Sequence, residues 1–431
     1  MLYPIELRGP ESESLADPPP PLANAPVRPG RTLRALVAPP TAQTRPVAAL
    51  PLGGLTFLCS LGTGVIWNAI YFIAKSEYGF SETDSLLLAF VNGLLYMGVA
   101  LAAGRVVRTL ERRLSTRGAL AVVLVAQAAL APLVVVFPGT AMLWFVAIVL
   151  SAMGALQWPV VEHYLASGRH GPEMRQAIGW WNTSWMAATA ISLAATGPLA
   201  ALGLMRWAIP SLLPINLIAL LFLAAFPRRP AAHCAEERAR HVPPSYHGLL
   251  AASRVLHPLG YLVLGALAPV LPYLFQGLGT APSLQAPLGS TWQVARLVAV
   301  VLLWRTAFWH GRAATLALAG VLLATGFAVA VSAPSEWALA LGLAALGAGQ
   351  GVAYYTAIYY GLAVGAAEVD AGGTHEALVG TGYFAGPALG LATIAAGAGT
   401  PVFIGLVLGA LALGFVAAFV RGGRASSHAT A

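Results

Sequence analysis

Long apolar stretches alternate with short polar ones along almost the whole chain. A bilayer core about 30 Å thick requires roughly 20 mostly apolar residues per helix, so each such stretch, bounded by charge, Gly or Pro, predicts a membrane span. The twelve windows that fit are Leu55–Ala74, Ser85–Ala103, Gly118–Phe137, Ala141–Leu165, Ala177–Leu199, Trp207–Phe226, Leu256–Gln276, Thr291–Phe308, Ala313–Val331, Trp337–Val364, His375–Ala396 and Pro401–Val420. The pattern predicts an all-α polytopic membrane protein with about twelve spans.

Polar segments divide these windows into two sets of six. The chain begins with a Pro- and Arg-containing segment that lacks the apolar core of a secretory signal, and we expect it to be disordered. The predicted organisation is a cytosolic tail (1–50), a first six-helix half (51–226), a cytosolic linker (227–250), a second six-helix half (251–421) and a C-terminal cytosolic tail (422–431).

Composition agrees with this class and excludes others. Of the 431 residues, 58% are hydrophobic and 9% are charged, whereas about 25% are charged in a soluble domain, so an ordinary water-soluble enzyme is excluded. The net charge of +8 comes from short separated clusters, which gives no reason to expect a nucleic-acid partner. No nucleotide-binding Gly-Lys-Ser/Thr loop is present, and two distant cysteines form no metal-ligand spacing, so we expect no cofactor, no metal and no enzymatic activity.

The basic residues also predict the orientation. All Lys and Arg except Lys75, Arg206 and Arg296 fall in segments that share one side of the membrane if the N-terminus does. Cationic loops resist translocation, so this side is the cytosol. We therefore expect an integral protein of the cytoplasmic (inner) membrane with both termini in the cytosol.

The loop after the second span carries the most specific motif. It contains Gly104, Arg108, Glu111, Arg112 and Arg113, and it resembles the loop signature of the major facilitator superfamily of secondary transporters. Gly104, Arg112 and Arg113 are in register, whereas Arg108 replaces the family's Asp and Glu111 its second Gly. The resemblance implies that this loop latches two pseudo-symmetric halves together on the cytosolic side, with Glu111 as the candidate carboxylate. The alternative is an ordinary cytosolic loop, which is rich in Arg because cationic loops stay in the cytosol.

A glycine pattern in span eleven is a second resemblance. Gly373, Gly382, Gly386-Pro387 and Gly390 have the spacing of the signature that exporters of this family carry in span five. The resemblance favours efflux slightly. Close helix packing explains the same residues without export, because small side chains let helices approach each other.

The resemblance further implies that spans one, four, seven and ten line a central cavity. A polar side chain in hydrocarbon is costly, so those in mid-span are expected to face the bundle interior. The candidate cavity residues are Asn68, Tyr71, Gln157, Trp158, Tyr261, Gln350 and Tyr354. They predict an aromatic, hydrogen-bonding cavity for a small molecule.

Two charged residues within spans are candidates for specific roles. Glu162 is the only acidic residue expected inside a span, and a carboxyl group in low dielectric can exchange a proton, so we assign it to proton coupling. The alternative is a hydrated or Arg169-paired residue at a helix end. Arg296 can hold a carboxylate or phosphate and is a candidate anion anchor, unless it snorkels or pairs with Glu336.

The sequence thus predicts a secondary active transporter that moves a small organic solute across the bilayer by alternating access, with protons as the expected coupling partner. The degraded loop signature leaves a second interpretation open, a non-transporting membrane receptor or scaffold with the same fold. Nothing in the sequence selects the substrate.

Overall fold

The computed structural model describes residues 46–169, 171–231, 243–364 and 369–430. Residues 1–45 of the predicted N-terminal tail and 232–242 of the predicted linker lie outside these residues. Within them, every regular element is a helix. The helices are α1 (Ala49–Gly64), η1 (Val65–Ala69), α2 (Ile70–Tyr78), α3 (Glu82–Leu110), α4 (Thr116–Leu130), α5 (Leu133–Val136), α6 (Thr140–Ala166), α7 (Gly171–Ala201), η2 (Met205–Trp207), α8 (Leu212–Leu223), α9 (Pro244–Leu267), α10 (Leu271–Gly277), α11 (Pro282–Gly289), α12 (Thr291–Arg305), α13 (Ala313–Val331), α14 (Glu336–Val364), α15 (Val369–Ala395) and α16 (Thr400–Thr430).

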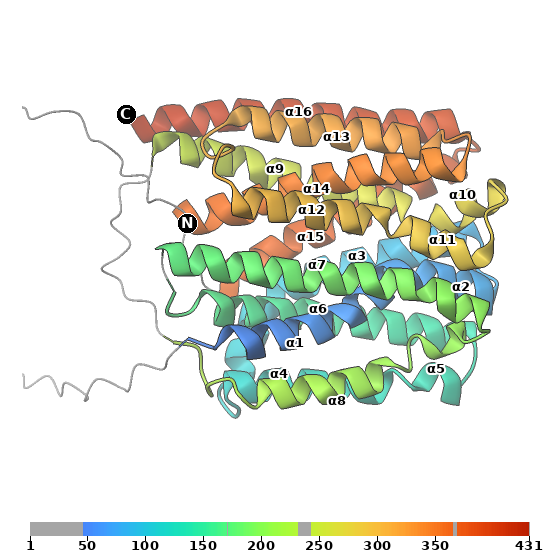
Figure 1. Ribbon diagram of the computed structural model, residues 1–431, viewed down its shortest axis with the longest axis horizontal. Coiled ribbons are helices and arrows are strands. Elements are labelled where there is room, and N and C mark those ends of the chain that lie inside the picture. Colours follow the sequence, from blue (N-terminus) through green and yellow to red (C-terminus); the bar gives the residue numbers. More distant parts are fainter. Residues whose placement is uncertain (1–45, 170, 232–242, 365–368, 431) are drawn as a thin grey trace, which may run out of the picture. The chain divides into compact units, whose positions relative to one another are not determined.

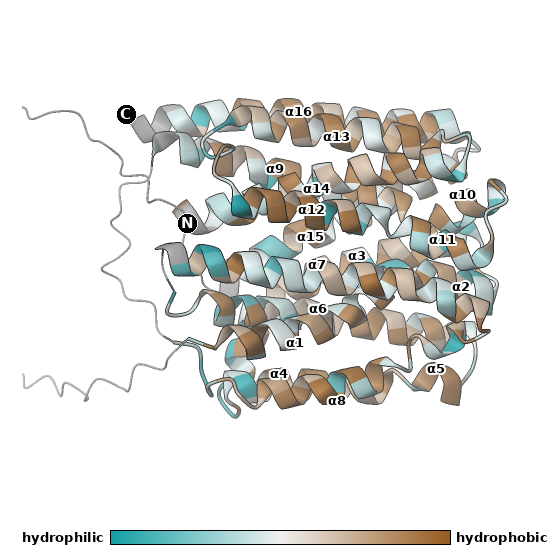
Figure 2. Ribbon diagram, viewed as in Figure 1, coloured by the Kyte–Doolittle hydropathy of each residue, from teal (hydrophilic) through white to brown (hydrophobic). Residues whose placement is uncertain are grey.

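The membrane spans follow the apolar windows closely. In the described part of the chain, eleven helical segments are long and apolar enough to cross a bilayer. The remaining window corresponds to α7, a 31-residue helix with a more polar sequence. Apolar residues dominate the length of α8 and α13, as expected for helices that face lipid (Figure 2).

Irregular segments mark the helices that surround the centre of the bundle. Span one changes from α-helix to a π-helical stretch, η1, and back to α-helix. Span seven, predicted as one helix, is α9 followed by the short α10, and Pro272 occupies the first turn of α10. Span eight is preceded by α11, whose Pro282 begins a short helix before α12. The predicted C-terminal tail is helical, since α16 continues to Thr430.

The bundle has two distinguishable ends. Figure 1 shows that α1 begins and α16 ends at one of them, which we call the terminal end, while α2, α10 and α11 lie at the other, the distal end. The two most extensive sets of contacts between the first six spans and the last six form two seams. In one, α3 packs on α15; in the other, α7 packs on α11 and α12. We call these contacts the α3–α15 seam and the α7–α12 seam.

Glycines allow the helices to approach closely at the α3–α15 seam. A Cβ atom at Gly93 would lie 2.4 Å from the Phe384 backbone nitrogen, and one at Gly380 would lie 2.7 Å from the Met97 nitrogen. On its other side α15 packs on α9, where Gly386 approaches the Leu262 carbonyl. The interpretation of the span-eleven glycines as packing residues is therefore confirmed.

Candidate functional site: a charged aromatic cavity

A cavity of about 70 Å³ lies between the two seams. It is bordered by α1, η1, α3, α6 and α7 from the first half of the chain and by α9, α12, α14 and α15 from the second. Its aromatic lining consists of Trp67, Tyr96, Trp158, Trp181, Trp185, Tyr261, Tyr354 and Tyr383. This cavity is enclosed by residues of both halves, so relative movement of the halves would change access to it.

The aromatic side chains of this cavity contact each other in a continuous group. Trp67 stacks on Tyr383 with ring centroids 4.4 Å apart and meets Tyr96 edge-on at 5.1 Å. Tyr383 in turn contacts Tyr261 at 5.0 Å. Such contacts hold rings of both halves in defined positions, and they leave flat apolar walls around a few polar groups.

The structure places the predicted cavity residues in different surroundings. Asn68, Trp158, Tyr261 and Tyr354 line this central cavity. Gln157 instead borders a smaller cavity of about 30 Å³ between α1, α4, α6 and α8, together with Trp158. Tyr71 and Gln350 are buried outside the lining of the central cavity.

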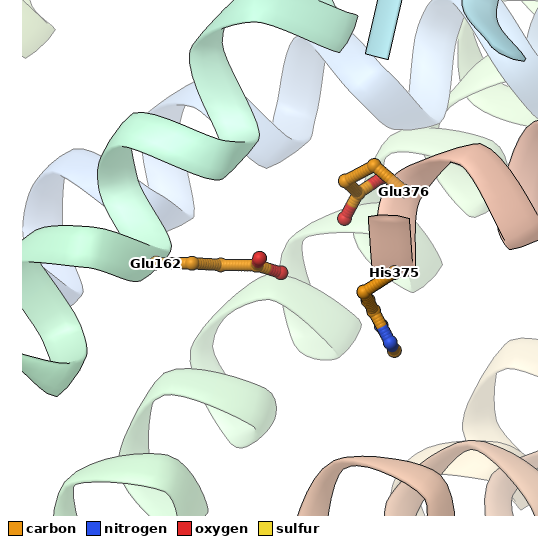
Figure 3. A group of neighbouring side chains, drawn as sticks. All are labelled: Glu162, His375 and Glu376. Atoms are coloured by element: carbon orange, nitrogen blue, oxygen red, sulfur yellow. The ribbon is translucent and has the colours of Figure 1, made fainter. Parts of the chain in front are cut away.

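Glu162 lies opposite a second carboxyl group, that of Glu376, which falls at the start of the predicted window His375–Ala396. Glu376 belongs to α15 and is 8% exposed, so the expectation that Glu162 is the only acidic residue inside a span is wrong. Glu162 extends from α6 toward the first turns of α15, where Glu376 and His375 lie (Figure 3). One oxygen of each of the two carboxyl groups lies within 4.8 Å of the other. The hydroxyl of Tyr96, from α3, donates to Glu376 Oε2.

Arg169 is not the partner of Glu162. Its guanidinium group donates to the backbone carbonyls of Val47, Tyr164 and Leu165. The alternative of a Glu162–Arg169 ion pair at the end of the helix is therefore wrong.

Two histidines lie beside the carboxyl pair. His257, which is 1% exposed, stacks on His375 with ring centroids 4.5 Å apart. Glu162, His375 and Glu376 each offer one ligand atom, and these atoms lie within 4.8 Å of one another. Ligand atoms around a tetrahedral zinc ion are roughly 3.5 Å apart. The group could hold a metal ion only after contraction, so its present geometry suits a shared proton better.

Arg296 faces the central cavity from α12. It is 2% exposed, and its guanidinium carbon lies 4.1 Å from the Trp185 ring centre and 5.1 Å from that of Tyr354. Snorkelling toward the membrane surface and pairing with Glu336 are therefore wrong interpretations for this residue. Gln293, one turn earlier in α12, lines the same cavity.

The loop signature lies at the terminal end. Gly104 and Arg108 border a pocket of about 270 Å³ together with Arg105 and with Gly373 and Thr374 of α15. Glu111 accepts a hydrogen bond from Thr116, which precedes the next span in the same half. Arg112 and Arg113 are exposed. The motif thus borders the other half through its first residues, Gly104 and Arg108, whereas Glu111 forms its hydrogen bond within its own half.

The distal end is closed by a different set of contacts. Lys75 donates to the Pro272 carbonyl at 2.6 Å, which joins α2 to α10. The Tyr273 hydroxyl donates to the Phe80 carbonyl at 2.8 Å and lies 3.0 Å from Ser85 Oγ. These links connect spans of opposite halves across the distal end of the cavity.

Solved structures of two transporters share this fold, in agreement with the all-α polytopic fold that the sequence predicts. The human organic anion transporter MFSD10 (TETRAN) has a TM-score of 0.60 and 15% sequence identity, over 85% of this chain and 97% of that protein. The Escherichia coli fucose:proton symporter FucP has a TM-score of 0.55 and 16% identity, over 86% and 98% of the two chains. No protein-family model and no curated protein sequence matches the chain.

Proposed function

We propose that this protein is a secondary active transporter that moves a small organic solute through the membrane by alternating access. The observation that carries the proposal is the cavity lined by both halves, with charged groups from α12 and α15 among its aromatic walls. The similarity to an organic anion transporter and a fucose:proton symporter supports it. Rocking of the halves around such a midplane site is the general mechanism of this fold.

We further propose the sequence-derived topology: halves at 51–226 and 251–421, and a terminal end that faces the cytosol of a bacterial-type inner membrane. Most Arg residues flank that end, in accordance with the resistance of cationic loops to translocation. Packing of α15 on α9 also explains the glycine pattern that favours efflux. The direction of transport is therefore left to the flux measurement below.

Proton coupling is assigned to Glu162 together with Glu376. Coulomb repulsion between two carboxylates in contact is large where water is scarce, and it is removed when one of them binds a proton. The carboxyl groups belong to α6 and α15, on opposite halves. Separation of the halves would therefore change the affinity of the pair for that proton, which links proton binding to the transport cycle.

A flux experiment tests this function. The purified chain is reconstituted in liposomes that contain a pH-sensitive dye, and a solute library is added outside. We expect an active solute to move protons with wild type and with Glu173→Gln, an exposed acidic residue of α7, but not with Glu162→Gln or Glu376→Gln. Unchanged solute-driven proton movement in Glu162→Gln would contradict the coupling. Solute binding without any flux would favour the receptor interpretation.

A further inference from the structure

Arg296 is a buried cation that forms no ion pair with a carboxylate among the residues that the structure describes. Its Nη2 donates to the Tyr261 hydroxyl at 3.0 Å, and its Nε is enclosed without an acceptor. Glu376 lines the same cavity, but its carboxylate accepts from the Tyr96 hydroxyl and lies beside Glu162. A buried charge is costly unless it is paired, so this arrangement favours occupation of the site by an anion.

Aromatic rings surround the guanidinium group of Arg296. Four rings have their centres between 4.1 and 5.9 Å from the guanidinium carbon: Trp185, Tyr354, Tyr261 and Trp292. Rings stabilise a cation through their faces but do not neutralise it. A carboxylate is the complementary group, because it accepts hydrogen bonds in the plane of the guanidinium.

The size and lining of the cavity around Arg296 indicate what the rest of the ligand looks like. The cavity volume of about 70 Å³ corresponds to roughly five water-sized groups. Thr189 and Gln293 supply neutral polar groups beside Arg296, and they are joined by a hydrogen bond of 3.2 Å. Most of the other lining side chains are aromatic, which suits a small, flat or short apolar body.

We propose that the central cavity binds a small organic solute through its carboxylate and that Arg296 is the residue that holds this group. The inference rests on the proposed function in that it identifies this cavity as the solute site. It narrows the substrate from any small organic molecule to one that carries a carboxylate, either as a simple organic acid or as an amino acid.

Ligand binding to the full-length protein in detergent tests the proposal without requiring transport. The probes are propanoate and benzoate, their uncharged amides, and free alanine, with thermal unfolding and titration calorimetry as readouts. We expect the carboxylates to bind and stabilise the protein and the amides to do neither. A comparison of alanine with propanoate shows whether the site accepts a ligand that carries an ammonium group next to its carboxylate.

Matched variants locate the site. Arg296→Gln is expected to lower carboxylate affinity about 10- to 100-fold, since a hydrogen-bonded charge pair is lost. Arg296→Lys restores part of it. Arg305→Gln removes an exposed Arg of the same helix, which stacks on Trp304 at 4.6 Å, and should bind as wild type.

Three results would overturn the proposal: amides that bind as well as carboxylates, no binding of either carboxylate, or full affinity in Arg296→Gln. If Arg296→Gln does not fold, the carboxylate–amide contrast in wild type and the affinity of Arg296→Lys decide instead. Carboxylate binding without flux supports this proposal and contradicts transport. Flux of an uncharged solute without carboxylate binding contradicts this proposal and supports transport.

Discussion

The two seams between the halves differ in how they are built. At the α3–α15 seam the backbones touch through glycines such as Gly93 and Gly380, and Glu376 points from it toward Glu162. At the α7–α12 seam Gly197 also approaches a backbone atom, the Ser283 carbonyl of α11, but beside the cavity the halves meet through side chains, with Trp185 against Arg296. A backbone contact has little freedom to adjust, whereas side chains can repack. The first seam therefore fixes the geometry of the proton site, and the part of the second seam that borders the cavity can adapt to a solute.

The largest expected effect comes from disturbing the rigid seam. Gly93→Ala would place Cβ 2.4 Å from the Phe384 nitrogen of the other half. We expect destabilisation of about 1–3 kcal/mol and loss of transport, measured by thermal unfolding and liposome flux. Gly98→Ala, on the same helix with no atom within 4 Å of its Cβ, is the control. Equal behaviour of the two variants would show that the seam is not rigid.

At the adaptable seam the expected effect is moderate and confined to binding. Trp185→Leu removes the ring closest to Arg296. A cation–π contact of about 0.5–2 kcal/mol corresponds to a loss of carboxylate affinity of roughly 2- to 30-fold. Calorimetry measures this loss, and Trp337→Leu, which alters a 70% exposed residue, is the control. A fall in unfolding temperature as large as that of Gly93→Ala would remove the distinction between the seams.

The contact between α2 and α10 at the distal end belongs to neither seam, so a change there tests the opening of the cavity by itself. Lys75→Met removes the hydrogen bond to the Pro272 carbonyl and the ammonium group 4.6 Å above the Tyr273 ring. Loss of this partly exposed link should speed solute exchange about 2- to 10-fold, as the closed state loses one stabilising contact. Lys75→Arg retains a donor and should exchange more slowly than Lys75→Met. An unchanged exchange rate in Lys75→Met would exclude a gating role.

The smallest effect is expected at a histidine outside the membrane spans. His310 lies between α12 and α13, stacked on Tyr359 at 4.6 Å, and burial together with the charge of Arg175 lowers its pKa. A lowered pKa keeps the imidazole neutral from about pH 6.5 to 8. His310→Gln should therefore leave the pH profile of transport unchanged in this range. A shifted profile would place part of the proton response outside the α3–α15 seam.

Most of the helical framework could be predicted from the sequence, because span length and polarity are local properties. The window Ala141–Leu165 differs by one residue at each end from α6 (Thr140–Ala166). The break in span seven was missed, since proline tolerance in a membrane helix depends on its neighbours. The more polar sequence of α7 reflects residues such as Trp185 and Thr189 that face the cavity.

The site was predictable only in part. Glu162 and Arg296 were recognised because charges inside apolar windows are rare. Glu376 stands at the start of the window His375–Ala396, close to the acidic residues Glu368 and Asp370, so its sequence neighbours indicate a polar segment and not the interior of a span. Its proximity to Glu162 follows from the packing of α15 on α6, which one sequence does not encode locally. The aromatic contacts of Trp185 and Tyr383 likewise result from packing between helices that are far apart in the sequence.

The π-helical stretch in span one has a consequence for comparing sequences. A π-helical turn contains one residue more than the α-helical turn it replaces. Deleting one residue from Val65–Ala69 would restore a regular α-helix, and the two parts of span one would keep their relative orientation because the residue removed is the extra one. The change would be confined to the π-helical residues, among them Trp67 and Asn68, which both line the cavity. A single-residue gap at this point of an alignment would therefore indicate a binding site that differs locally in chains whose remaining helices superimpose.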